Sequence, residues 1–393
     1  MNVSDRISDQ VNRVPRSGIR DFFELVIGRD DVISLGVGEP DFSAPWHIRE
    51  AAIYSLEKGM TSYTSNLGLL SLRQEISKYV KEQFGVEYDP GSEVLITVGV
   101  SEALDLACRA ILNPGDEVIY HEPCYVSYSP SVIMAYGEAV PVATRAEEGF
   151  ALKADALAPV VTPKSKALML NFPTNPTGGT LDRRDVKEIA EFAVENDLIV
   201  LTDEIYSELL YNGETHHSVA AEPGMRERTI LFHGFSKAFA MTGFRLGYAC
   251  GPAPLIEAMM KIHQYSMLCA PITSQMAALE ALRNGGPSMK KMRDSYAMRR
   301  RILLDGFRDI GVPCPEPKGA FYAFPDVSGT GLTSKEFATR LLEEKNVAAV
   351  PGDAFGPSGE GHLRCCYATA LEKVEVALGK MGELVAAIEK EGS

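Results

Sequence analysis

The residues best suited to chemistry lie in one glycine-bounded segment, 234–247. Lys237 stands there among Gly, Ser, Ala and Phe, with no acidic residue in the segment to pair with it. A lysine in apolar surroundings loses its proton more readily, and its neutral amine can attack a carbonyl carbon. Ser236 precedes it and Arg245 ends the same segment. This combination suits a small phosphorylated aldehyde, although Lys237 taken singly also fits an ordinary surface lysine.

Polar residues follow two further apolar runs. Asp203 ends the run 197–203, and Tyr206 comes three residues later. A carboxylate at a strand end can pair with a cofactor ring nitrogen, and the tyrosine can reach a ring oxygen; a helix-capping acid is the ordinary alternative. Asn175 follows another run and offers an amide donor in a proline-rich turn, 171–179, which by itself also fits a simple loop.

A fourth signal is a strand-to-helix junction at Gly99 and Ser101. The free N–H groups of a helix start, a hydroxyl cap and the helix dipole together favour an anion. Taken singly, each of the four signals also fits a residue without a role in catalysis or binding. Their order along the chain does not have such an explanation.

The elements that must position these residues alternate through 46–285. Short apolar runs separated by amphipathic stretches predict a mostly parallel sheet sandwiched by helices, with ligands at the carboxyl ends of the strands. The expected strands are 93–97, 117–121, 166–172, 197–203, 228–235 and 245–251.

The pattern changes after a long amphipathic stretch, 272–310. Residues 286–393 mix strands and helices and predict a smaller α+β domain. The expected strands are 319–325 and 362–368, and the expected helices lie near 333–345 and 371–390. Residues 1–45 are too short to fold alone, so we expect them to form an arm that completes this domain.

Composition excludes several classes of function. Thirty-nine basic against fifty-three acidic residues give a net charge of −14, which disfavours nucleic acid and anionic membranes. The seven cysteines are scattered and none forms a C-x-x-C motif, so we expect reduced core cysteines, a cytoplasmic location and no metal site. The first ten residues are polar and charged, and no apolar run is long enough to span a membrane, so we expect neither secretion nor a membrane span.

Seven motifs in succession resemble the class I and II aminotransferases, which are pyridoxal-phosphate enzymes of fold type I. The match runs from near Pro15 to the C-terminal helix, and jointly its motifs are highly specific. They are SLGVGEPDF, YTSNLGLLSLR, TVGVSEAL, NFPTNPTGG, DEIYSELLY, SKAFAMTGFRLG and HLRCCYATA. The resemblance implies a transaminase that binds pyridoxal phosphate.

The resemblance also implies roles around the cofactor ring. Lys237 matches the lysine that bonds to the cofactor aldehyde and later moves the substrate's α-proton. Asp203 matches the carboxylate paired with the pyridine nitrogen. Asn175 and Tyr206 match the groups bonded to the ring's phenolic oxygen, and Tyr125 matches the aromatic residue stacked on the ring.

The phosphate and the partner subunit follow in the same way. The backbone around Val100, Ser101 and Glu102 matches the helix-start phosphate cradle, to which Ser236 and Arg245 add side-chain contacts. Tyr63, in the segment TSYTSN, resembles the tyrosine that reaches the phosphate of the neighbouring subunit, which implies a homodimer.

The substrate carboxylate is the third ligand group. Arg364 matches the arginine that binds the α-carboxylate as a bidentate fork, and Gly38 supplies a main-chain contact. An arginine facing solvent on an edge strand is the alternative. Cys365 and Cys366 follow Arg364 where small or hydroxylated residues are commoner, a departure that bears only on local packing.

The reaction implied is a ping-pong transfer between an L-amino acid and a 2-oxo acid, with glutamate and 2-oxoglutarate as the shared pair. Ile19, Phe22 and Phe23 of the arm favour an aromatic or apolar side chain, unless they merely pack the arm in place. A C–S β-lyase on the same fold is the main alternative. A ligand sensor fused to a DNA-binding module would need a basic helical domain before the arm, which we do not expect here.

Overall fold

The structure is a computed structural model that describes residues 3–24, 28, 29 and 31–391, without the side chains of residues 21–23. The expectation for Phe22 and Phe23 therefore falls outside the described side chains.

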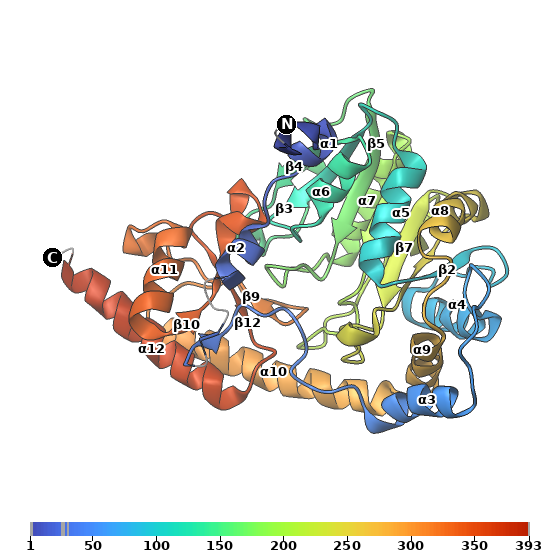
Figure 1. Cartoon of the computed structure of the whole chain (residues 1–393). Coiled ribbons are helices and arrows are strands. Elements are labelled where there is room, and N and C mark those ends of the chain that lie inside the picture. Colours follow the sequence, from blue (N-terminus) through green and yellow to red (C-terminus); the bar gives the residue numbers. More distant parts are fainter. Residues whose placement is uncertain (1–2, 25–27, 30, 392–393) are drawn as a thin grey trace.

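A seven-stranded sheet forms the centre of the larger part (Figure 1). Its order is β2-β8-β7-β6-β5-β3-β4, and every pair is parallel except those that β8 makes with β2 and β7. The strands are β2 (Val94–Thr97), β3 (Glu117–Glu122), β4 (Glu138–Ala143), β5 (Ser165–Asn171), β6 (Ile199–Asp203), β7 (Thr229–Gly234) and β8 (Gly247–Cys250). The sequence did not predict β4, the edge strand, in which only Val142 is buried.

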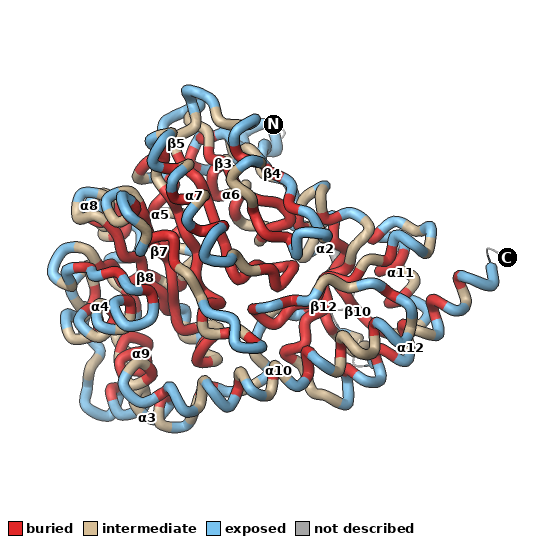
Figure 2. Tube along the Cα trace, turned by 180° about the vertical axis from the view of Figure 1, so that it is seen from behind, coloured by how far each residue is buried: buried red, intermediate tan, exposed pale blue. Residues whose placement is uncertain are grey.

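Helices cover both faces of this sheet. The larger part contains α3 (Trp46–Glu57), α4 (Leu70–Phe84), α5 (Val100–Ile111), α6 (Tyr128–Met134), α7 (Arg183–Glu195), α8 (Ala253–Ser266) and α9 (Ile272–Asn284). Alternate residues along each strand point to opposite faces. One face packs against α5, α6 and α8, and the other against α4, α7 and α9. Figure 2 shows the buried residues concentrated along the strands between these layers.

The smaller part is built from the C-terminal segment and the arm. It contains α10 (Gly286–Asp309), α11 (Ser334–Lys345), α12 (Leu371–Glu391) and an antiparallel sheet of β11 (Val350–Pro351), β12 (Leu363–Cys366) and β9 (Tyr322–Ala323). In the arm, β1 (Ile33–Ser34) pairs in parallel with β10 (Val347–Ala348), and the short helix α2 (Gly18–Glu24) packs nearby. The predicted fold class is therefore confirmed, whereas the division at residues 45 and 285 stays a prediction.

The amphipathic stretch 272–310 is not one helix, because α9 ends and α10 begins at Gly285. A Cβ there would meet the Ala281 carbonyl oxygen and the Phe239 ring. In Figure 1, α10 then runs from the larger part to lie beside α12 in the smaller one.

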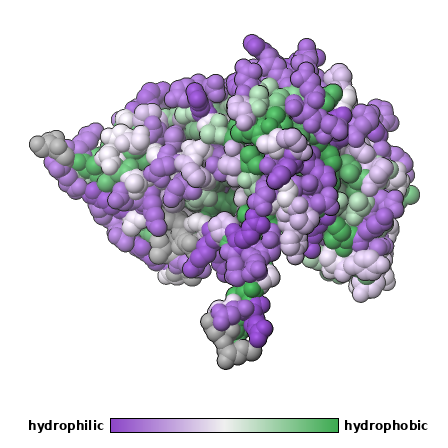
Figure 3. All heavy atoms as spheres, turned by 90° about the horizontal axis from the view of Figure 1, so that it is seen from above, coloured by the Kyte–Doolittle hydropathy of each residue, from purple (hydrophilic) through white to green (hydrophobic). Residues whose placement is uncertain are grey.

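The surface is mostly polar on the face that Figure 3 shows, with smaller hydrophobic areas, and the cysteines form no disulfide. All seven cysteines are free. Among the described residues, no helix is long and apolar enough to cross a membrane, and no cluster of metal ligands occurs.

Candidate active site

A cavity of about 340 Å³ opens at the carboxyl ends of β5, β6 and β7, where the start of α5, the arm and the smaller part meet. It brings together most of the residues singled out in the sequence. These are Gly38, Val100, Ser101, Tyr125, Asn175, Asp203, Tyr206, Ser236, Lys237, Arg245 and Arg364. Tyr128, Asn171 and Tyr322, which sequence reasoning missed, line the same cavity.

Lys237 presents an amine without a counter-ion. Its Nζ donates to the Gly38 carbonyl oxygen at 2.8 Å, and no ion pair of Lys237 occurs within the described part of the chain. Burial lowers the pKa of Lys237 to about 8, and the nearby Arg364 guanidinium also lowers it. The neutral amine, the form that acts as a nucleophile, is therefore far more populated near neutral pH than in an ordinary lysine with a pKa of about 10.4.

Asp203 is the buried carboxylate of the cavity. The Tyr128 hydroxyl donates to its Oδ2 at 2.9 Å, and the backbone N–H of Ile205 donates to its Oδ1 at 3.2 Å. Burial raises the pKa of Asp203 to about 6, and the Tyr128 hydrogen bond opposes that rise. The carboxylate has no cation within salt-bridge distance in the described residues, so the site could accept a protonated ring nitrogen.

Asn171 and Asn175 join the ends of two neighbouring strands. The Asn171 amide donates to the Asp203 carbonyl oxygen at 2.9 Å, and its Oδ1 accepts the backbone N–H of Asn175 at 3.2 Å. The Asn175–Pro176 peptide bond is cis. Through Asn171, these contacts tie the Asn175 backbone to the end of β6.

Two tyrosines link the larger part to the smaller one. The Tyr206 and Tyr322 hydroxyls lie 2.9 Å apart, and the Tyr322 hydroxyl also donates to the Gly38 carbonyl oxygen at 3.3 Å. Tyr322 comes from β9, 116 positions from Tyr206, so no local pattern announced this contact. Tyr322 of the smaller part therefore connects the Tyr206 hydroxyl of the larger part to the arm.

Arg364 is a buried guanidinium on the central strand of the three-stranded sheet, with 2% of its surface exposed. Its Nη1 donates to Asn175 Oδ1 at 3.0 Å and its Nη2 to the Gly36 carbonyl oxygen at 2.5 Å. Its Nε has no hydrogen-bond partner among the described residues. The solvent-facing alternative is thus wrong, and a buried cation with a spare donor suits an anionic ligand.

The start of α5 forms an anion cradle with Arg245. Gly99, just before the helix, has φ 78°, and a Cβ there would lie 3.0 Å from Arg245 Nη2. Glycine thus lets the guanidinium approach the free N–H groups of the helix start. Val100, Ser101 and Ser236 line the same side of the cavity.

Two predicted residues do not line the cavity. The Glu102 carboxylate accepts from the backbone N–H of Val98 at 2.5 Å and contacts His263 Nδ1 at 2.7 Å, so its side chain stabilises the start of α5. Tyr63 is 82% exposed. Whether Tyr63 reaches another subunit stays a prediction.

The arrangement fits pyridoxal phosphate. The cavity holds an amine without a counter-ion, a buried carboxylate without a cation, and a helix start beside an arginine, which match the cofactor's aldehyde, ring nitrogen and phosphate in chemical character. Among the described residues, Arg364 Nε has no hydrogen-bond partner, so this N–H is available to an anion.

Comparisons with known proteins agree with this geometry. The family model "Aminotransferase class I and II" matches residues 30–381. The chain is 46% identical to an aspartate aminotransferase of Pyrococcus abyssi, over 96% of this chain and 98% of that protein. It is 43% identical to aromatic-amino-acid aminotransferase 2 of Thermococcus litoralis, over 96% and 98% respectively. The crystal structure of an aromatic aminotransferase from Pyrococcus horikoshii superposes with a TM-score of 0.90 at 45% identity, covering 94% of this chain and 99% of that one.

Proposed function

Because the chain belongs to the class I and II aminotransferases, which are pyridoxal-phosphate-dependent transaminases, we propose that it binds this cofactor in the cavity around Lys237. The family resemblance of its motifs is confirmed. We further propose a ping-pong reaction between an L-amino acid and a 2-oxo acid, with glutamate and 2-oxoglutarate as the shared pair. The convergence of Lys237, Asp203 and Arg364 on one cavity carries this proposal.

When bound, pyridoxal phosphate supplies an aldehyde that joins to amines and a ring that accepts the electrons of the substrate's Cα–H bond. Asp203 keeps the ring nitrogen protonated, and the Tyr128 hydroxyl holds the accepting carboxylate oxygen. Asn175 and Tyr206 would hold the ring oxygen, and Tyr125 would pack on the ring. These side chains all line the cavity.

Lys237 has two tasks in this proposal. With the cofactor in place, its neutral Nζ would hold the cofactor through the aldehyde, and as a free amine it would take the proton from the substrate Cα. A lysine pKa of about 8 suits both tasks, because the amine exchanges a proton readily near neutral pH. When it is not bonded to the cofactor, Nζ donates to the Gly38 carbonyl oxygen, which holds the amine in the cavity.

Arg364 holds the substrate for this proton transfer. Its guanidinium is fixed by Asn175 and Gly36, and the Tyr322 and Phe355 rings lie 4.8 and 4.9 Å from its Cζ. A bidentate contact to the α-carboxylate fixes the direction of the Cα–H bond. Gly38 adds a main-chain contact in this proposal.

The side-chain preference is proposed to be broad and aromatic or apolar. Lys237, Arg245 and Arg364, each with a role above, are the cations lining the cavity within the described residues, so none is left for a second substrate carboxylate. Ile19 of α2 lines the cavity and offers an apolar wall. The C–S lyase alternative is not favoured, because the relatives named above are aminotransferases.

A homodimer with Tyr63 at the partner's phosphate is also proposed. Large hydrophobic side chains are exposed in the segments around Tyr63, where a second copy would cover them. They are Trp46, Tyr54, Leu56, Leu70, Tyr265 and Met267. Asn66 donates to the Leu268 carbonyl oxygen, which holds two of these segments together. The seven free cysteines support a reducing compartment such as the cytoplasm.

The test of the proposed function is Lys237→Ala. The wild-type protein should retain pyridoxal phosphate through gel filtration as a yellow complex and lose that absorbance when amino donors are added. Lys237→Ala should lose both the bound absorbance and turnover while keeping its circular dichroism spectrum. Full activity of Lys237→Ala would overturn the proposal. A panel of aromatic, aliphatic and acidic donors then measures the side-chain preference.

A further inference from the structure

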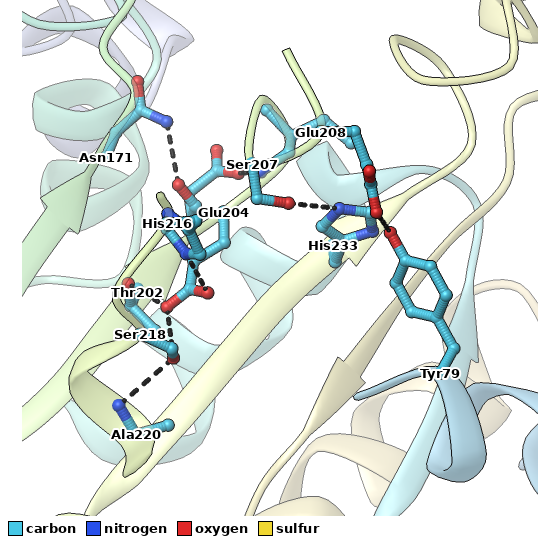
Figure 4. Close-up of polar contacts among 12 residues, drawn as sticks. Tyr79, Asn171, Thr202, Glu204, Ser207, Glu208, His216, Ser218, Ala220 and His233 are labelled. Carbon is cyan, nitrogen blue, oxygen red and sulfur yellow. Dashed lines mark hydrogen bonds and ion pairs between the residues drawn. The ribbon is translucent and has the colours of Figure 1, made fainter. Parts of the chain in front are cut away.

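A buried histidine outside the cavity, His233, contacts chain segments that carry cofactor-site residues. It lies in β7 and packs against the Tyr79 and Phe84 rings of α4, at centroid distances of 5.7 and 5.5 Å. Its Nε2 lies 3.1 Å from Ser207 Oγ, a contact that Figure 4 displays, and its Nδ1 lies 3.1 Å from the Tyr248 hydroxyl.

Each end of this hydrogen-bonded trio borders a residue of the site. Ser207 directly follows Tyr206, and His233 lies four residues before Lys237 in the chain. Tyr248 is the cross-strand partner of His233 in β8, three residues after Arg245. One imidazole therefore ties together the loop after β6, the end of β7 and the start of β8.

We call the hydrogen-bonded group of His233, Ser207 and Tyr248 the clip, and its chemistry keeps these hydrogen bonds in place. A neutral imidazole carries one donor and one acceptor, and the Ser207 and Tyr248 hydroxyls can serve as either. Burial lowers the pKa of His233 to about 3, helped by His216, so the ring stays neutral at working pH. Both ring nitrogens are satisfied inside the protein.

Neighbouring polar contacts hold the other side of the same loop. Glu204 accepts from the Ser218 hydroxyl at 2.7 Å and contacts His216 Nε2 at 2.7 Å, and Glu208 accepts from the Tyr79 hydroxyl (Figure 4). The loop that carries Tyr206 is thus anchored on both sides; Ser207 is its side-chain link to β7, beside the backbone bond from Glu204 N–H to the Phe232 carbonyl oxygen.

We propose that His233 is a positioning residue for transamination, which through Ser207 and Tyr248 fixes Tyr206 relative to Lys237. The inference rests on the proposed function. Without the clip, the Tyr206 hydroxyl would be held less well against the ring oxygen of the cofactor. The pKa of the cofactor-bound nitrogen of Lys237 would then differ from its value in the wild type.

The experiment compares holoenzymes of the wild type, His233→Phe, Ser207→Ala and Tyr248→Phe. The readouts are the pH midpoint at which the absorbance of the Lys237-bound cofactor changes, kcat and KM separately, and thermal stability. We expect His233→Phe and Ser207→Ala to shift the midpoint by about half a pH unit or more. We expect kcat to fall about tenfold, because small misplacements in the site are costly. Tyr248→Phe should have the smaller effect.

Thr229→Val is the matched control. Thr229 lies in the same strand, and its buried hydroxyl has no hydrogen-bond partner among the described residues. The near-isosteric change should leave the midpoint and kcat at wild-type values. Ser207→Ala and Tyr248→Phe each remove one hydroxyl, so they keep the test open if His233→Phe does not fold.

The inference is overturned if Ser207→Ala and Tyr248→Phe titrate and turn over like Thr229→Val, even with lower thermal stability, because His233 would then serve the fold alone. A failure of the proposed function looks different. In that case the wild type would show no Lys237-dependent absorbance at all.

Discussion

The two halves of the cavity are built in different ways. The half that we propose holds the cofactor, which we call the cofactor half, contains Asn175, Asp203 and Lys237 and comes from the ends of neighbouring strands of the mostly parallel sheet. In the substrate half, Arg364 bonds to the arm at Gly36 across 328 positions of the chain. The first half needs only the large sheet, whereas the second exists only when both ends of the chain meet. We therefore expect substitutions in one half to affect the cofactor and those in the other to affect substrate binding.

The halves are nevertheless joined at the mouth of the cavity. Arg364 donates to Asn175, Lys237 donates to Gly38, and Tyr206 meets Tyr322. A substrate bound to Arg364 is thereby placed relative to the amine of the other half. The predictions below test how far the two halves act separately.

The largest effect is expected for Asp203→Ala, in the cofactor half. Loss of the carboxylate that holds the ring nitrogen protonated should raise the barrier by about 4 kcal/mol, as for other groups that stabilise developing charge. Steady-state kinetics should show this loss in kcat, with KM for the amino acid nearly unchanged. An equal loss in KM would mean that the halves are not separable.

Arg364→Ala, in the substrate half, should come next. Removal of a buried charged contact to the α-carboxylate should lower kcat/KM by a factor that corresponds to about 3 kcal/mol of activation free energy. The loss should lie mainly in KM, and the bound cofactor should keep its absorbance and affinity. Arg364→Lys is the control: it keeps the charge but lacks the fork, and should recover only part of the loss. Loss of the cofactor from Arg364→Ala would contradict the division.

The rate at which the cofactor-free protein takes up pyridoxal phosphate should depend on pH through Lys237. Its lowered pKa means that the neutral amine is lost as pH falls through about 8. The rate should therefore fall towards tenfold per pH unit below that value and level off above it, as followed by absorbance. The reaction of pyridoxal phosphate with a free lysine derivative, whose pKa is ordinary, should still become faster as the pH rises well above about 9. The same behaviour in the protein would contradict the shifted pKa.

The smallest effect is expected for Tyr128→Phe. Because the Tyr128 hydrogen bond lowers the pKa of Asp203, its loss should raise that pKa above about 6 and leave more of the carboxyl protonated and neutral. Cofactor affinity should fall by about 1 kcal/mol, and more at pH 6 than at pH 8. Equilibrium dialysis measures this.

Tyr120→Phe provides a comparison for that measurement. Tyr120 also donates to a buried carboxylate, Glu122, but neither residue lines the cavity. It should leave cofactor affinity unchanged at both pH values. Equal effects of the two substitutions would remove the special role of Tyr128.

Local patterns in the sequence predicted the fold class and the strand-end residues of the cavity, whereas Gly38, Tyr125 and Arg364 were singled out only by the family resemblance. Asp203 ends an apolar strand, Asn175 follows one within four residues and Lys237 follows one within three, so the mostly parallel sheet brings them to the same edge. Tyr128 was missed because its contact with Asp203 spans 75 positions and its local setting, a short buried helix, is that of a core tyrosine. The reversal of β8 was missed because an apolar strand reads the same in either direction.

By itself, the sequence determined which residues stand at strand ends and helix starts, since apolar periodicity and turn residues are local signals. The tertiary structure decided which of them share a proton or a ligand. Burial of Lys237 and Asp203, the unpartnered Nε of Arg364 and the clip at His233 depend on chain segments far apart in sequence. Desolvation and hydrogen-bond pairing are set by what packs around a group, and no local pattern encodes that neighbourhood.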